Sequence, residues 1–222
     1  MFARIPEPEL MLAPAQVEAY AKADFSEPHQ RYVELCRSIF GPELKDGWVL
    51  DLGCGPGDVT FRFARAFPQT RIIGVDGSPG MLQWARAALE QDAALAPRIQ
   101  FLEGYLPRAT IPNHAYAAII SNSLLHHLPD PLVLWQTVRA QARPGTRIGI
   151  MDLLRPATES AARDMVAHYA AGEPAGLQTD FFNSLCAAYR PEEVRQQLGQ
   201  STLAHLKVEA VSNRHWLVSG II

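Results

Sequence analysis

A glycine-rich segment that directly follows an apolar run is the feature that most constrains the fold of this chain. Residues 49–57 read VLDLGCGPG, which predicts a buried strand and a loop that opens a helix, where backbone amides approach a nucleotide-like ligand closely. A second apolar run ends in Asp76, 19 residues beyond Gly57 (76 minus 57). An acidic residue at this distance is typical of one that binds ribose hydroxyls. The pattern therefore predicts a ligand site between these two strand ends.

Strand-like and helix-like segments alternate five times between residues 48 and 153. After the first strand, the expected strands are residues 71–76, 99–102, 115–121 and 146–153. Such alternation predicts a doubly wound, parallel α/β sheet whose ligands lie beyond the carboxyl ends of the strands.

The rest of the chain departs from this alternation. Two strand-like runs, 203–211 and 215–221, are separated by a three-residue turn and predict an antiparallel hairpin. Helical and aromatic segments before the hairpin predict a substrate cap, and the first 40 residues contain a candidate lid. We expect a single domain, 1–222, with four parts: N-terminal lid helices (1–45), a cofactor-binding core (46–153), a cap with the last helix (154–200) and a C-terminal hairpin (201–222).

Composition limits the classes of function. The net charge is −3 and no basic run stands out, so nucleic-acid substrates are disfavoured. The start lacks a signal-peptide pattern, and no apolar stretch has the length of a membrane span. The three cysteines form no C-x-x-C pair, and the histidine pair His126-His127 has no obvious third ligand nearby in the sequence. We therefore expect a cytoplasmic protein with no membrane partner and no metal site.

Four motifs in order, VLDLGCGPG, IIGVDGSPGML, SNSLLHHLPDP and RPGTRIGIMD, resemble the successive motifs of class I S-adenosylmethionine-dependent methyltransferases. The resemblance covers residues 48–153. It implies a mostly parallel seven-stranded sheet with a reversed last strand, S-adenosylmethionine as cofactor and S-adenosylhomocysteine as product. The fourth-strand motif is most similar to the small-molecule branch of the family. The acceptor, and whether its reacting atom is oxygen, nitrogen or carbon, stay open.

The resemblance also implies roles for individual residues. Asp51 and the backbone of residues 53–57 would hold the methionine end of the cofactor, Asp76 the ribose, and Met81 the adenine. Tyr105 is a departure, because relatives usually carry an acid there. The residues expected at the cofactor are Asp51, Gly53, Cys54, Gly55, Gly57, Asp76, Gly77, Met81, Gly104, Tyr105, Leu106, Ser121 and Asn122.

Residues His126 and His127 are the candidate catalytic groups. They follow the fourth strand, and an imidazole there could remove a proton from the acceptor as the methyl group arrives. In the alternative interpretation, one ring packs against the cofactor and the other bonds to the backbone. The candidates for the substrate pocket and the lid are Tyr20, Phe25, Tyr169, Phe181 and Phe182.

Two other functions compete with methyl transfer to a small-molecule acceptor. An NAD-dependent oxidoreductase would need glycine at position 58, where a carboxylate, Asp58, would oppose a pyrophosphate. A non-catalytic cofactor-binding or interaction module would keep the fold but lack a usable acceptor pocket. The oligomeric state stays open, with a homodimer as one option.

Overall fold

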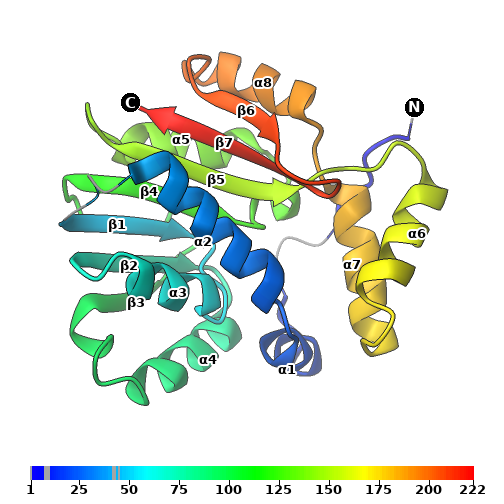
Figure 1. Ribbon diagram of the computed structural model, residues 1–222, viewed down its shortest axis with the longest axis horizontal. Coiled ribbons are helices and arrows are strands. Elements are labelled where there is room, and N and C mark those ends of the chain that lie inside the picture. Colours follow the sequence, from blue (N-terminus) through cyan, green and yellow to red (C-terminus); the bar gives the residue numbers. More distant parts are fainter. Residues whose placement is uncertain (1, 8–10, 42–43, 45) are drawn as a thin grey trace.

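A single mixed β-sheet forms the centre of the molecule in the computed structural model, which describes residues 2–7, 11–41, 44 and 46–222 (Figure 1). Within these residues the sheet has seven strands in the order β3-β2-β1-β4-β5-β7-β6. The strands are β1 (Gly47–Leu52), β2 (Thr70–Asp76), β3 (Ile99–Glu103), β4 (Tyr116–Asn122), β5 (Arg147–Leu153), β6 (Lys207–Ala210) and β7 (His215–Ile221).

The first five strands pair in parallel, and β7 runs antiparallel to both β5 and β6. The strand order reverses direction at β1, with β2 on one side and β4 on the other. The carboxyl ends of these neighbouring strands form the crevice where ligands bind in doubly wound sheets. The predicted fold class, including the reversed last strand, is confirmed.

Helices cover both faces of the sheet. They are α1 (Pro14–Lys22), α2 (Ser26–Phe40), α3 (Asp58–Ala66), α4 (Pro79–Glu90), α5 (Leu132–Gln141), α6 (Glu159–Tyr169), α7 (Ala175–Ala187) and α8 (Pro191–Gln200). Alternate residues of a strand point to opposite faces. Accordingly, Val49 of β1 packs in the core shared with α2 and α3, whereas Leu50 packs in the core shared with α5 and α8. Burial on both faces explains why these strands are almost continuously apolar.

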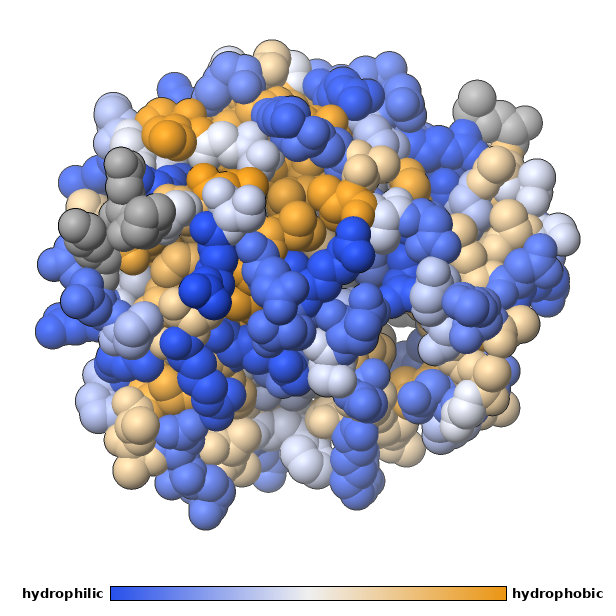
Figure 2. All heavy atoms as spheres, in the orientation of Figure 1, coloured by the Kyte–Doolittle hydropathy of each residue, from blue (hydrophilic) through white to orange (hydrophobic). Residues whose placement is uncertain are grey.

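Two groups of helices lie beyond the carboxyl ends of the parallel strands. Figure 1 shows α1 and the start of α2 on one side and the α6–α7 pair on the other. In the space-filling view, the surface is hollowed between these two groups (Figure 2). Helices α1 and α2 correspond to the predicted lid, and α6 and α7 to the predicted cap. No helix in the described part of the chain is both long and apolar enough to cross a bilayer.

The hairpin differs from its prediction in one strand. Strand β7 has the expected bounds, but β6 is limited to Lys207–Ala210 and does not begin at residue 203. Leu203 and Leu206 are buried in a turn, where the Leu203 N–H donates to the carbonyl of Leu198 in α8. These leucines therefore belong to the turn that connects α8 to β6. The alternating pattern of apolar residues in the sequence cannot distinguish such a turn from a strand.

Candidate functional site

The loop after β1 is held against the end of β2 by backbone hydrogen bonds. The N–H groups of Gly53 and Cys54 both donate to the carbonyl oxygen of Val75, at 2.8 and 3.2 Å. Gly53 has a φ of 73°, and a Cβ there would lie 2.9 Å from the side chain of Leu124. Glycine is required at this position because both the backbone angle and the close approach exclude a side chain.

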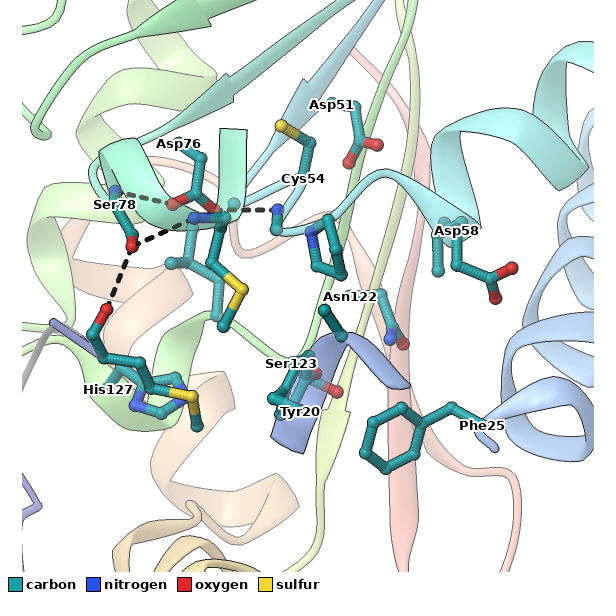
Figure 3. A pocket seen from close by; sticks show the side chains of 18 of the residues that line it. Tyr20, Phe25, Asp51, Cys54, Asp58, Asp76, Ser78, Asn122, Ser123 and His127 are labelled. Carbon is teal, nitrogen blue, oxygen red and sulfur yellow. Dashed lines mark hydrogen bonds between the residues drawn. The ribbon is translucent and has the colours of Figure 1, made fainter. Parts of the chain in front are cut away.

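Asp76 ends β2 and connects this strand to the loop after β1 and to the residue that precedes α4. Its carboxylate accepts hydrogen bonds from the N–H of Gly55 and the N–H of Ser78, each at 2.8 Å (Figure 3). Burial raises the pKa of Asp76, although these two bonds partly oppose that effect. Ser78 in turn caps α4 by accepting a bond from the N–H of Met81.

Asp51 lies inside the sheet, with 1% of its surface exposed. Burial raises the pKa of Asp51 to about 7, even though a hydrogen bond from the Thr60 hydroxyl, at 2.5 Å, lowers it. Cys54 is also buried, and burial raises the pKa of its thiol well above the ordinary value, so a thiolate is disfavoured.

These groups line a first cavity at the carboxyl ends of β1, β2 and β4 (Figure 3). Of the residues predicted from the sequence, it contains Tyr20, Phe25, Asp51, Gly53, Cys54, Gly55, Asp76, Gly77, Met81, Gly104, Tyr105, Leu106, Asn122 and His127.

Aromatic side chains of the lid cover this cavity. The rings of Tyr20 and Phe25 lie 4.8 Å apart between centroids, and the ring of His29 lies 5.4 Å from that of Phe25. His29 Nδ1 contacts Asp58 Oδ2 at 2.7 Å, which connects α2 to the first turn of α3. Burial, together with several carboxylates led by Asp76, raises the pKa of Tyr20 to about 12.

A second cavity adjoins the first and lies between the lid and α7. The residues that line both cavities include Tyr20, Phe25, Asn122, Ser123 and His127. Of the other predicted residues, the second cavity adds His126, Tyr169 and Phe181.

His126 belongs to a buried polar cluster beside the second cavity. Its Nδ1 contacts Asp152 Oδ1 at 2.5 Å, and its backbone N–H donates to the same carboxylate at 3.2 Å. Glu7 Oε1 lies 3.3 Å from His126 Nε2 and 3.3 Å from His127 Nδ1. Burial alone would lower the pKa of His126, but the carboxylates of Asp152 and Glu7 raise it above its usual value.

Three predicted residues line neither cavity. The hydroxyl of Ser121 is buried and donates to the carbonyl of Leu52 at 2.7 Å, so it bonds to the neighbouring strand. Gly57 caps α3, where a Cβ would lie 2.9 Å from the ring of Phe61. Phe182 lies under the guanidinium of Arg163, 4.8 Å from the ring centroid.

Among the residues at the site that were not predicted are Glu7, which contacts the cavity-lining His126 and His127, and Ser123. Glu7 lies in an extended segment whose Ile5 N–H donates to the carbonyl of Cys186, and no motif signals this placement. Ser123 follows β4 with a φ of 57°, unusual for a residue other than glycine, and it lines both cavities. Its place after the fourth strand is the available signal, although only its neighbours Ser121 and Asn122 were predicted as site residues.

The fold is similar to that of known methyltransferases. A crystal structure of a SAM dependent methyltransferase from Aquifex aeolicus superposes with a TM-score of 0.68, covering 96% of this chain and 100% of that chain at 18% identity. Residues 49–145 match the family described as "Methyltransferase domain". The chain is therefore similar to methyltransferases in its fold and, over residues 49–145, in its sequence.

Curated relatives match this chain over part of its length. The trans-aconitate 2-methyltransferase of Azoarcus sp. (strain BH72) is 36% identical over 102 residues, which is 46% of this chain and 37% of that protein. The enzyme of the same name from Enterobacter sp. (strain 638) is 41% identical over 101 residues, 46% of this chain and 36% of that protein. The matched part therefore spans little more than a third of either relative.

Proposed function

We propose that this chain is an S-adenosylmethionine-dependent methyltransferase that acts on a small-molecule acceptor. The observation that carries the proposal is the arrangement around Asp76. Its carboxylate accepts a hydrogen bond from the glycine loop at the end of β2, the position of the ribose-binding acid in nucleotide-binding folds of this type. The names of the similar proteins support the same cofactor and the same class of reaction.

In this proposal the first cavity holds the cofactor. The Asp76 carboxylate accepts hydrogen bonds from the ribose hydroxyls, and Asp51 faces the ammonium group of the methionine end. Met81 and Tyr105 lie at the adenine. The product S-adenosylhomocysteine keeps these contacts but lacks the sulfonium charge.

The second cavity holds the acceptor. Asn122, Ser123 and His127 line both cavities, so the two cavities meet at these residues. A methyl group can therefore pass directly from the cofactor in the first cavity to the acceptor in the second. Displacement needs the two reactants in line and little water, and the lid rings of Tyr20 and Phe25 supply that enclosure. The general-base role of His126 or His127 stays a prediction.

Charge in the second cavity favours a neutral or cationic acceptor. Among the described residues, the cavity is lined by Asp24, Glu27, Glu173 and Asp180 but by a single arginine, Arg214. The guanidinium of Arg214 pairs with Glu27 at 2.7 Å. A tricarboxylate such as trans-aconitate, named for the curated relatives, would meet net repulsion here.

The second cavity also weakens the non-catalytic alternative, which requires the space above the cofactor to be closed or filled. The cytoplasmic location and the homodimer stay predictions from the sequence.

Calorimetry with S-adenosylmethionine, S-adenosylhomocysteine and NAD, beside the Asp76→Ala variant, tests the proposal. We expect both adenosyl compounds to bind the wild type, NAD to leave no signal, and the variant to lose affinity. Binding of NAD, or of none of the three, would overturn the proposed cofactor.

A further inference from the structure

We propose that Glu7, His126 and His127 form a site for a divalent transition-metal ion, with zinc as the ion that fits best. The site lies beside the second cavity, so its use in catalysis rests on the proposed function, but its existence does not. The three side chains place a carboxylate oxygen and two imidazole nitrogens within 4.8 Å of one another.

Two of the three spacings between donor atoms match tetrahedral coordination. Glu7 Oε1 lies 3.3 Å from His126 Nε2 and 3.3 Å from His127 Nδ1. Ligands bound to zinc at about 2.05 Å in a tetrahedron are about 3.3 Å apart, whereas the same bond length in an octahedron places neighbouring ligands about 2.9 Å apart. Two histidines and one glutamate, with a fourth position left open, are a donor set of catalytic zinc sites.

Hydrogen bonds with neighbouring side chains already orient two of the three ligands. Asp152 accepts the Nδ1–H of His126 at 2.5 Å, which leaves the Nε2 lone pair directed to the side where Glu7 lies. Metal-binding histidines commonly have such a carboxylate partner, because it fixes both the tautomer and the ring orientation. The hydroxyl of Ser184 donates to Glu7 Oε1 at 3.0 Å and so orients the carboxylate.

Charge balance supports the same conclusion. The side chains of Glu7 and Asp152 are 10% and 1% exposed, so two carboxylates lie in a water-poor region. Arg4, the nearby cation, donates to the carbonyl oxygens of Ala187 and His126 and forms no ion pair with Glu7 within the described residues. A divalent ion offsets both carboxylates and leaves both histidines neutral, which is their ligating form.

An ion at this site narrows the acceptor class. The ligands His126 and His127 line the second cavity, which also contains aromatic rings, including those of Phe25 and Phe181. A neutral hydroxyl or thiol compound with an apolar body fits this cavity. Bound to the ion, its O–H or S–H group loses the proton to solvent more readily. The oxygen or sulfur then forms a bond to the methyl carbon while the bond from that carbon to the sulfonium sulfur breaks. His126 Nε2 then serves as a ligand in place of the general base predicted from the sequence.

Zinc titration of the chelator-treated chain, followed by calorimetry without any cofactor, tests the site. We expect one equivalent of zinc to bind, and Glu7→Gln and His127→Gln to weaken binding about 100-fold or more. His205→Gln is the matched control, because His205 is exposed and lies in the loop between α8 and β6. Cobalt substitution adds a second readout, since tetrahedral cobalt gives intense visible absorption.

Circular dichroism and S-adenosylhomocysteine binding of each variant identify any that fail to fold. The site would be overturned if the wild type bound zinc no more tightly than the folded variants Glu7→Gln and His127→Gln. Because zinc is titrated without cofactor, failure of the metal site leaves the proposed methyl transfer standing. Failure of cofactor binding, conversely, leaves the zinc result intact.

Discussion

The backbone N–H of Gly55 donates a hydrogen bond to the carboxylate of Asp76 at 2.8 Å, so the glycine loop after β1 and the acidic end of β2 form one unit. Either part alone is a weak signal for a nucleotide-like ligand. Their connection holds the loop against the carboxylate, and a loop held in this way has a lower ordering cost of binding.

Replacing Gly55 tests whether the loop itself touches the cofactor. A Cβ at Gly55 would have no atom within 4 Å, so Gly55→Ala adds a methyl group to open space at the first cavity. We expect the affinity for S-adenosylhomocysteine to fall about tenfold or more, which is ~1.4 kcal/mol, by calorimetry.

The control for this change is Gly145→Ala. Gly145 also has a left-handed backbone, with a φ of 95° against 52° for Gly55, and a Cβ there is equally unobstructed. Both variants should lose about 1–2 kcal/mol of stability from backbone strain, but only Gly55→Ala should lose affinity. Equal ligand affinity in the two variants would contradict contact between the loop and the cofactor.

Cofactor binding should depend on pH through Asp51. Burial raises the pKa of Asp51 to about 7, so below that pH the carboxyl group is protonated and cannot pair with an ammonium group. The affinity for S-adenosylmethionine should therefore fall by up to about tenfold for each pH unit below 7 and level off above it. Calorimetry from pH 5.5 to 8.5 measures this slope.

Asp51→Asn separates this effect from the stability of the fold. The folded-state pKa of Asp51 lies above its unfolded value of about 4, so this buried carboxyl group lowers the stability of the fold progressively as pH rises from about 4 to 7, and the full cost is present above pH 7. The variant should melt several degrees higher than wild type at pH 8, yet bind the cofactor weakly and without the pH slope. A pH slope that persists in Asp51→Asn would assign it to another group.

The fold was predictable because local patterns along residues 48–153 agree with one another. Each strand is apolar and bounded by a glycine, proline or capping residue, as Ser78 shows at the start of α4. The predicted start of β6 was wrong because Leu203 and Leu206 are buried in a turn. In the sequence, a buried leucine in a turn looks the same as a buried leucine in a strand.

The candidate site was predictable only where it is built from consecutive motif residues. Ser121 has the polar character of a ligand contact, yet its hydroxyl bonds to the carbonyl of Leu52 across the sheet. Phe181 and Phe182 are neighbours on α7, and helical geometry sends only the first into the cavity. Glu7 meets His126 through tertiary packing alone, which no local pattern encodes.

The lid should control how fast the product leaves. Phe25 lies between Tyr20 and His29, lines both cavities and is only partly buried, so Phe25→Ala removes cover without opening the core. We expect S-adenosylhomocysteine to dissociate about tenfold faster in stopped-flow displacement, with little change in its association rate. Ile39→Ala, on the exposed face of α2, is the matched control and should release the product at the wild-type rate. An unchanged dissociation rate in Phe25→Ala would exclude this ring from the lid.

The contact between His29 and Asp58 should stabilise the lid in a pH-dependent way. Although burial acts to raise it, hydrogen bonds from His29 and Arg62 lower the pKa of Asp58 to about 2. A depressed folded-state pKa contributes stability that is present above the unfolded value of about 4 and is lost as pH falls toward 2. In urea titrations, Asp58→Asn should therefore be less stable than wild type at pH 7, and the difference should shrink between pH 5 and pH 3. Because the Asp58 side chain is 43% exposed, solvent screening keeps the effect small. A difference in stability that is the same at pH 7 and pH 3 would mean that Asp58 acts through packing and not through its charge.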